Sequence, residues 1–461
     1  MIERGEIGLK KKELSTTQII LLGFLLAIII GTILLSMPFV TTSGQPTPMI
    51  DALFTATTAV CVTGLVTVDT YAHWNFFGQL IILILAQIGG LGVVSITTGA
   101  MLLIGQKVSL KDRLLIGNAY NLDTLSGLVK FFKKIVLGTF IVEGLGAIGY
   151  AFVFVPQFGW KKGLWASVFN GVSAFCNAGM DVIAPDSLAQ YVSNPWINFV
   201  TITLIILSGL GFVVWWDMID VWKRIRAKEV PLKWLFRKCT LHTKIVLAMS
   251  GILLFGGAAL ILLLEYENPA TLGNLSFGDK LMAAMFQSVT TRTAGFFTIP
   301  QQNFTDASIL VCMIMMFIGG SPSGTAGGVK TTTVAIILIA AMSIIKGTEE
   351  AEAFRRAIPL KTVRKAMAVV LVSFSVLLGG TVALSAVTGG DFVDVIFEMA
   401  SAVGTVGLTR GFTGTMNVAG KLIVIVCMYL GRIGPISLAI AIQAKKRRGL
   451  ASFAEEDVTV G

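Results

Sequence analysis

One pattern occurs four times along this chain: an apolar run, a short segment that ends in a Ser- or Thr-containing loop closed by Gly, and a second apolar run. Three copies carry a Phe ten residues before the closing Gly, and Met285 takes that place in the third copy. Internal repeats restrict the architecture before any local interpretation. A helix–loop–helix unit used four times can close a four-fold ring around a pore. The loops are Thr58–Gly64, Ser173–Gly179, Thr290–Gly295 and Ser401–Gly407.

The chain is too apolar for a soluble protein of its length. Hydrophobic residues make up 54% of it and charged residues only 13%, and the apolar residues come in runs long enough to cross a bilayer. The first run, Ile19–Met37, follows Lys10, Lys11 and Lys12, as a signal peptide would. We favour a first transmembrane helix, because the run is long for a signal and no clear cleavage site follows.

The basic residues are distributed unevenly between the two sides of the predicted membrane. Of the 36 Lys and Arg, 28 fall in segments that we assign to the cytoplasm. This bias follows the positive-inside rule and predicts a multi-pass protein of the plasma or inner membrane with both termini cytoplasmic. The net charge of +10 is therefore a topology signal, and no nucleic-acid partner is expected.

We expect an all-α fold with eight spanning helices and four half-length pore helices. The half-length segments, about 50–60, 163–175, 279–290 and 391–403, are too short to span and must re-enter. The expected order is a cytoplasmic N-terminus 1–17, repeat A 18–104, linker 105–132, repeat B 133–220, basic linker 221–241, repeat C 242–345, linker 346–362, repeat D 363–444 and a cytoplasmic tail 445–461.

Each expected inner helix carries a Gly cluster. Such a cluster could serve close packing of helices or could line the pore. We favour the pore-lining role, because the clusters recur at matched depth in all four repeats. Repeat C differs, since 319–330 is too rich in Gly, with Pro322, to be continuous helix. We expect its inner helix to be broken within the membrane and the break to line a cavity. In repeat B we expect one inner helix over about 197–220.

Ionisable residues inside apolar stretches suggest function. Lys330 and Arg432 stand out because each lies beside an inner-helix Gly cluster. Lys330 could instead extend to the cytoplasmic surface, and Arg432 could form a structural ion pair or bind carbonyl groups. Arg292 lies inside the third loop, where packing behind the loop is the simpler role. Glu143 and Glu398 fall in predicted helices, and the sequence names no partner for either.

Several patterns are discounted. Gly144–Gly149 matches GxGxxG, and Gly324–Thr331 approaches a phosphate-binding loop, but neither follows a strand. The five Cys lack metal-ligand spacing, and two His are too few for a metal site. No catalytic constellation is present, so we do not expect an enzyme or a tightly bound cofactor.

The loops suit a monovalent cation. No loop carries an acidic ring, and each pore helix would direct its negative C-terminal end at the pore. Backbone carbonyls can replace the hydration shell of the ion, and the closing Gly permits the conformation that this requires. These features of the loops suit K⁺ and Na⁺ alike.

The four loops, the stretch Val289–Phe296, the stretch Ser401–Leu408 and the Gly-rich break at 319–330 closely resemble the Ktr/Trk/HKT superfamily of potassium transporters. The resemblance covers about 18–445 and is greatest to the Ktr-type membrane subunit, the ion-translocating component. It implies four covalently linked M1–P–M2 repeats, like those of potassium channels, around one pseudo-fourfold pore.

The resemblance also implies roles for particular residues. The selectivity filter, which would bind K⁺, would comprise Cys61, Val62, Thr63, Gly64, Cys176, Asn177, Ala178, Gly179, Arg292, Thr293, Ala294, Gly295, Gly404, Thr405, Val406 and Gly407. Below it, an intramembrane gate loop would comprise Gly319, Gly320, Ser321, Gly324, Gly327, Gly328 and Lys330, with Arg432 facing it. Cys61 and Cys176 depart from the residues common in the family and make thiol sensitivity possible.

The resemblance further implies gated, Na⁺-dependent K⁺ uptake by symport and a homodimer within membrane lipid. It also implies a cytoplasmic ring of regulatory subunits as partner, and nucleotide would bind to that ring and not to this chain. The eight Lys and Arg in 223–244 and those of Lys445–Arg448 could dock such a ring or serve topology alone. A competing hypothesis is an ion-coupled transporter of a small solute with a midplane site at the broken helix. A scaffold without transport is a third hypothesis that the four loops disfavour.

Overall fold

The computed structural model describes residues 16–92, 128–348 and 350–434, and this part of the chain is almost wholly helical. Four described helices are long and apolar enough to cross a membrane. They are α1 (Thr16–Leu35), α6 (Leu128–Phe158), α11 (Leu241–Glu265) and α15 (Leu360–Thr388). Each is the first helix of one of the four repeats, as the sequence predicts.

A short helix follows each long one and is buried over most of its length. These pore helices are α2 (Met49–Cys61), α7 (Trp160–Cys176), α12 (Phe277–Thr290) and α16 (Phe392–Gly404). The first residues of α12 and α16 are capped by the side chains of Ser276 and Asp391, each of which accepts a hydrogen bond from a backbone N–H. Their bounds lie within about three residues of the sequence expectation.

The third helix of each repeat starts at a side-chain cap, and three of the four end at a glycine. The caps are Asn75, Asn194, Thr305 and Asn417. The helices are α3 (Phe76–Leu91), α8 (Pro195–Leu210), α13 (Asp306–Phe317) and α17 (Val418–Ile433). The residues after α3, α8 and α17 are Gly92, Gly211 and Gly434, with φ of 83°, 89° and 86°. That left-handed conformation stops a helix and favours glycine.

The prediction of one continuous inner helix over 197–220 is therefore wrong. At Gly211, α8 meets α9 (Phe212–Arg226) at an angle of 93°. In repeat C the predicted break is present between α13 and α14 (Thr331–Ile345). The parts of the expected inner helices beyond residue 92 in repeat A and beyond residue 434 in repeat D lie outside the described residues. Eight full-length spanning helices are thus not found in the described part, where the inner helices are shorter than the outer ones.

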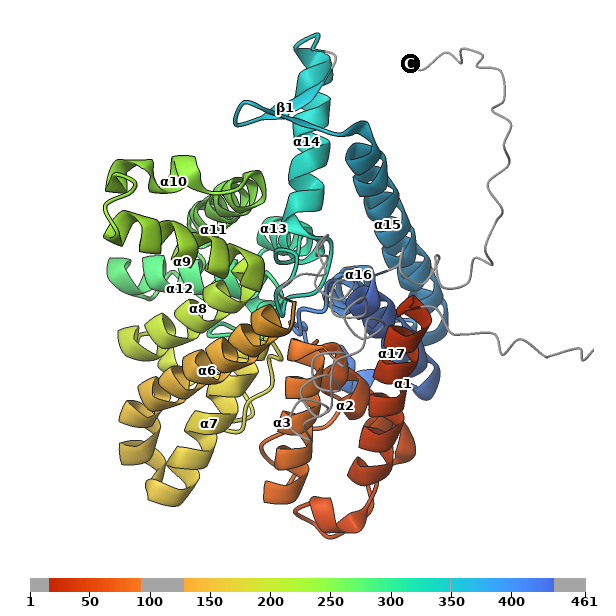
Figure 1. Cartoon of the computed structure of the whole chain (residues 1–461). Coiled ribbons are helices and arrows are strands. Elements are labelled where there is room, and N and C mark those ends of the chain that lie inside the picture. The colour runs from red at the N-terminus through yellow and green to blue at the C-terminus, as the bar shows by residue number, and fades with distance from the viewer. Residues whose placement is uncertain (1–15, 93–127, 349, 435–461) are drawn as a thin grey trace, which may run out of the picture.

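The four repeats close into a ring in which each inner helix packs on the pore helix of the next repeat. These contacts join α3 to α7, α8 to α12, α13 to α16 and α17 to α2, and Figure 1 shows the repeats around a common centre. An ion pair between Lys421 and Asp51 (2.6 Å) links the last repeat to the first. Trp165 donates to Gln79 (2.7 Å) across the boundary of repeats A and B. The chain thus has four M1–P–M2 units around one pseudo-fourfold axis.

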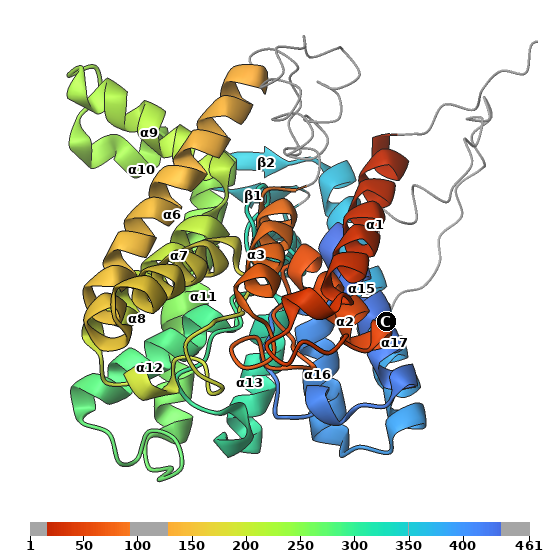
Figure 2. The same cartoon turned by 90° about the horizontal axis from the view of Figure 1, so that it is seen from below.

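Two small structures lie outside the ring. Helix α9 continues through a turn, η3 (Leu232–Trp234), into α10 (Leu235–Lys238), and Figure 2 shows α9 and α10 at the outer edge. A two-stranded antiparallel hairpin, β1 (Ala351–Ala353) and β2 (Arg356–Ile358), follows α14 and pairs Ala351 with Ile358. The sequence analysis expected only a linker there. Short turns η1 (Pro38–Val40), η2 (Ala189–Tyr191), η4 (Gln301–Asn303) and η5 (Thr413–Thr415) complete the connections.

We predict that the Lys421–Asp51 pair stabilises the ring closure. Both side chains are largely buried, with 14% and 12% exposed, so Lys421→Met leaves a carboxylate without its partner and should destabilise the fold by roughly 2 kcal/mol. The double variant with Asp51→Asn should recover part of the loss. Thermal unfolding in detergent measures this, and Lys223→Met, from a pair with both side chains 64% exposed, is the control. Equal melting temperatures for Lys421→Met and the control would contradict the prediction.

Candidate functional site

The four loop glycines meet in one closed ring at the centre of the molecule. A Cβ atom built on Gly64 would lie 2.6 Å from the carbonyl oxygen of Ala178, one on Gly179 would lie 2.7 Å from that of Ala294, and one on Gly295 would lie 2.6 Å from that of Val406. Gly407 completes the ring, since a Cβ atom built on it would collide with the carbonyl oxygen of Thr63. Each glycine thus lies against the carbonyl that precedes the glycine of a neighbouring loop.

All four ring glycines are in the left-handed region, with φ of 95°, 66°, 85° and 96° in chain order. Two residues before the glycine, Val62, Asn177, Thr293 and Thr405 also have positive φ, which non-glycine residues rarely adopt. Alternating left- and right-handed residues direct successive carbonyls toward the same side of a strand. The loops therefore have backbone geometry suited to presenting carbonyl oxygens to an ion.

A hydroxyl side chain at the end of each pore helix holds each loop. Thr58 and Ser401 accept from the N–H groups of Gly64 (2.9 Å) and Gly407 (3.0 Å). Ser173 and Thr290 donate to the carbonyls of the residues that follow Gly179 and Gly295. The predicted site did not include these four residues, although each opens its loop in the sequence. Their recurrence at one repeat position is the signal that could have identified them.

The remaining predicted filter residues lie in the same buried region. Cys61 and Cys176 end their pore helices and are fully buried, as are Thr63, Thr293 and Thr405. The hydroxyls of these three threonines have no hydrogen-bond partner in the described part of the chain. Buried polar atoms without a partner suggest an absent ion or water. Arg292 is also buried, and its Nε likewise lacks a partner.

The predicted gate loop, 319–330, has a closed neck. The N–H of Val329 donates to the carbonyl of Phe317 (3.2 Å), and that of Thr331 to Gly320 (3.1 Å). The hydroxyls of Ser321 and Thr331 are 2.9 Å apart. Gly319 packs against the backbone of Gly327, so the neck admits no side chain at this position. These contacts replace the helical hydrogen bonds that the break removes.

The tip of the loop reaches repeat B. Ser321 donates from its N–H to Gly209 (2.9 Å), and Phe212 donates from its N–H to the carbonyl of Ser323 (2.9 Å). A Cβ on Gly324 would lie 2.6 Å from the carbonyl oxygen of Ser208. The side chain of Asn177, a predicted filter residue, donates to Thr325 Oγ1 (3.1 Å). The loop therefore contacts both the second of the four glycine-ended loops and the inner helix of repeat B.

Repeats D and A also hold the loop. Arg432 on α17 donates to the carbonyl oxygen of Thr325 in the loop and to that of Gly89 on α3, which is the carbonyl-binding arrangement left open above. The amine of Lys330 donates to Ala326 (2.6 Å) within its own loop and is not directed to the surface. Gly327 and Gly328 lie against Thr405 and Gly404 of the fourth filter loop. Repeats B and D thus contact this segment directly, and repeat A is joined to it through Arg432.

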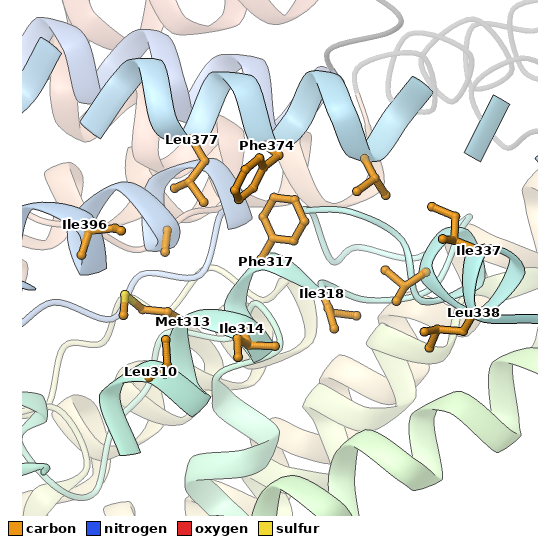
Figure 3. A pocket seen from close by; sticks show the side chains of 13 residues that line it. Leu310, Met313, Ile314, Phe317, Ile318, Ile337, Leu338, Phe374, Leu377 and Ile396 are labelled. Atoms are coloured by element: carbon orange, nitrogen blue, oxygen red, sulfur yellow. The ribbon is translucent and has the colours of Figure 1, made fainter. Parts of the chain in front are cut away.

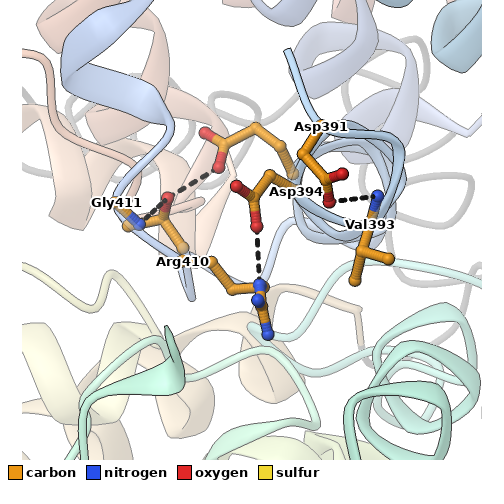
Figure 4. Close-up of polar contacts among 7 residues, drawn as sticks. Asp391, Val393, Asp394, Arg410 and Gly411 are labelled. Carbon is orange, nitrogen blue, oxygen red and sulfur yellow. Dashed lines mark hydrogen bonds and ion pairs between the residues drawn. The ribbon is translucent and has the colours of Figure 1, made fainter. Parts of the chain in front are cut away.

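The structure also supplies partners for two glutamates that the sequence left without any. The buried Glu398 accepts hydrogen bonds from Thr409 (2.7 Å) and Thr413 (2.5 Å) in the chain after the fourth filter loop. Figure 4 shows the neighbouring ion pair between Arg410 and Asp394 (2.6 Å). Glu143 on α6 accepts from the thiol of Cys176 (3.7 Å). Both glutamates therefore support filter loops from behind.

Two carboxyl groups follow the ring glycines of the first two loops, at Asp69 and Asp181. Burial is the main cause that raises the pKa of Asp181 to about 6, and a hydrogen bond from the N–H of Ile183 (3.5 Å) opposes it. The four loops themselves carry no acidic residue, and these two carboxyl groups lie beyond them.

An apolar cavity of about 370 Å³ lies between α13, α14, α15 and α16 (Figure 3). Phe317, Ile318, Phe374 and Leu377 are among its lining residues, and none of the lining side chains is charged or can donate a hydrogen bond. This cavity beside the broken helix therefore offers no groups to bind an ion or a polar solute.

Comparisons with known proteins agree with this architecture. The TrkH family, described as cation transport protein, matches residues 12–448. The chain is 39% identical over 459 residues to the potassium/sodium uptake protein NtpJ of Enterococcus hirae, with 98% of each chain covered. It is also 39% identical over 446 residues to the Ktr system potassium uptake protein B of Bacillus subtilis, with 96% of each covered.

The crystal structure of the potassium transporter TrkH from Vibrio parahaemolyticus has a similar fold, with a TM-score of 0.71 at 17% sequence identity, covering 96% of this chain and 87% of that one. The family consists of ion transporters and not of enzymes. With matches to its relatives along nearly the whole length, the chain belongs to the TrkH family of cation transport proteins, as a membrane subunit of the Ktr/Trk superfamily.

Proposed function

We propose that the chain is the ion-translocating membrane subunit of a gated potassium uptake system. The observation that carries this proposal is the closed ring of four left-handed glycines, each packed against the carbonyl group of a neighbouring loop. Partial dehydration of a monovalent cation requires such a set of carbonyl oxygens. The names of the relatives NtpJ and Ktr protein B, both potassium uptake proteins, support K⁺ as the transported ion.

The proposal also covers the dependence of K⁺ uptake on Na⁺ and the regulation of uptake by a partner. One relative is named a potassium/sodium uptake protein, and others are named as parts of a Ktr system. We assign to this chain Na⁺-dependent uptake, a homodimeric state and a cytoplasmic nucleotide-binding ring as partner. The charge bias supports the orientation, with both termini cytoplasmic. Lys445–Arg448, offered above as a docking segment, lies outside the described residues.

The gate loop would close the path below the filter. Its tip is held under the filter by Asn177 and Arg432, and two positive charges, Lys330 and Arg432, lie near the path. A cavity of about 100 Å³ between the loop, α15 and α17 offers space for displacement. The alternative, a solute transporter with a midplane site at the broken helix, is less well supported, because the large cavity there is apolar.

The first prediction concerns the transport itself. Expression in a cell that lacks potassium uptake should restore growth at low external K⁺, and more strongly when Na⁺ is present, if the chain is a Na⁺-dependent uptake subunit. Growth curves across a K⁺ series, with and without Na⁺, measure this. No rescue, despite normal amounts of protein in the membrane and co-expression of a regulatory ring, would contradict the proposal.

The second prediction concerns selectivity. Gly64→Ser, Gly179→Ser, Gly295→Ser and Gly407→Ser each combine a disfavoured φ with a collision against backbone, a strain of about 1–3 kcal/mol. Each should reduce the preference for K⁺ over Na⁺ by roughly tenfold. Ion uptake into proteoliposomes measures the apparent affinities. Gly278→Ser is the control, because a Cβ there meets nothing within 4 Å. Unchanged affinities in all four variants would exclude the filter assignment.

The third prediction concerns the gate. Deletion of Ser321–Gly327 should raise K⁺ flux several-fold and weaken its dependence on the regulatory partner, because it removes the backbone that closes the path while the charges of Lys330 and Arg432 remain. Arg432→Ala should act in the same direction but more weakly, since the other contacts of the loop remain. Flux measurements on variants that insert and dimerise normally test this. Lower flux in the deletion variant would show that the loop forms part of the transport site.

A further inference from the structure

The segment α9–η3–α10 has features that neither the filter nor the gate explains. Gly211 turns α9 through 93° from α8, so if α8 runs across the membrane, α9 runs close to the membrane plane. Figures 1 and 2 both show α9 and α10 at the edge of the molecule, away from the central ring. A segment so placed, at the end of an inner helix that crosses the membrane, would lie at the level of the lipid headgroups.

Internal contacts hold this segment in place. The N–H and hydroxyl of Thr240 both donate to Asp217 on α9 (2.9 Å each), and the amine of Lys244 donates to the carbonyl of Arg237 (2.9 Å). Val221 and Val230 are buried in the segment. Lys244, one of the eight basic residues that the sequence analysis grouped at 223–244, is therefore used within the fold.

Large apolar side chains nevertheless remain exposed on this segment. Trp222 is 52% exposed, Leu232 is 61% exposed and Phe236 is 42% exposed, with Ile219 and Trp234 at 37% and 38%. Outside a spanning helix, such side chains indicate a surface that meets a partner or a membrane. Trp together with aliphatic side chains is typical of the membrane interface.

The exposed charges of the segment are mainly positive. Seven exposed basic residues lie between Lys223 and Lys238, against the acidic residues Asp217, Asp220 and Glu229. Lys223 and Arg224 pair with Asp220 and Glu229 at 3.5 Å. Among the residues that the structure describes, no ion pair is found for the others: Arg226, Lys228, Lys233, Arg237 and Lys238. This excess of positive charge complements an anionic surface.

We propose that α9–η3–α10 is an interfacial anchor that binds anionic phospholipid headgroups of the cytoplasmic leaflet. Its exposed Trp, Leu and Phe side chains enter the boundary of the acyl region. The Lys and Arg without an ion pair contact the phosphates, and two of them, Arg237 and Lys238, lie over the ring of Trp234 at 5.5 Å. The anchor fixes the end of α8, whose Gly209 and Gly211 contact the gate loop. The inference rests on the orientation assigned under the proposed function and not on conduction of K⁺.

Fluorescence quenching by brominated lipids tests the anchor. The full chain is placed in nanodiscs of phosphatidylcholine that contain a minority of phosphatidylglycerol, with the bromine on one lipid or the other at equal mole fraction. Subtracting the spectra of Trp222→Phe and Trp234→Phe isolates the signal of each residue. We expect brominated phosphatidylglycerol to quench both about twofold more than brominated phosphatidylcholine, with the difference reduced by high salt. Trp74→Phe is the control, because Trp74 is 1% exposed.

A charge variant separates lipid binding from docking of a protein. Lys228→Glu with Lys233→Glu should abolish the preference for phosphatidylglycerol, whereas Lys161→Glu with Lys162→Glu, which changes two exposed lysines at the start of α7, should preserve it. Equal quenching by both lipids in the parent protein, or none by either, would overturn the proposal. An unchanged lipid preference in Lys228→Glu/Lys233→Glu, with lost co-purification of a cytosolic ring, would assign the surface to a protein. Neither result depends on K⁺ uptake, so a failure of this inference leaves the transport proposal to its own test.

Discussion

The packing of each ring glycine against a backbone carbonyl of a neighbouring loop is the contact on which the centre of this molecule depends. A Cβ at Gly64, Gly179 or Gly295 would lie within 2.7 Å of a carbonyl oxygen, far inside ordinary van der Waals distance. The obstacle is backbone, which cannot turn away as a side chain can. Glycine is thus favoured at these positions by φ and required by space, because L residues such as Val62 and Thr405 do adopt positive φ in the same loops. The hydroxyls of Thr58, Ser173, Thr290 and Ser401 then fix where each loop ends.

The loop between α13 and α14 is the second constraint, because irregular backbone inside a membrane must find hydrogen-bond partners within the protein. At the neck, the N–H groups of Val329 and Thr331 donate hydrogen bonds to carbonyls on the other side of the same loop. At the tip, the backbone of the loop is hydrogen-bonded to Gly209 and Phe212 of repeat B. Arg432 binds one more carbonyl of the loop. A guanidinium is well suited to this task, since it has several donors in a fixed plane and joins Thr325 to Gly89 of another repeat. The loop is held by many contacts between neutral groups and by two basic side chains, Lys330 and Arg432.

Much of this could be read from the sequence. The repeated loops gave the four units, their order and the pore helices to within a few residues, because length and apolar pattern decide whether a segment spans or re-enters. The break between α13 and α14 was predictable from its Gly and Pro content. The bend at Gly211 was not, since one glycine between two apolar runs is also common in straight packed helices. The β1–β2 hairpin and the Lys421–Asp51 pair, formed by residues 370 positions apart, depend on tertiary contacts that have no local pattern.

The departure of repeat C from the symmetry of the ring has a geometric reason. Four equal loops can surround an axis, but only one segment can occupy the space on the axis itself. A chain with four linked units can therefore carry a long break in repeat C, while in repeat B α8 turns into α9 at the single residue Gly211. The other three repeats then become its contacts: Asn177 and Gly209 from B, Gly404 and Arg432 from D, and Gly89 from A through Arg432. A displacement of the loop must break bonds to more than one repeat at once, so its position is coupled to the packing of the whole ring.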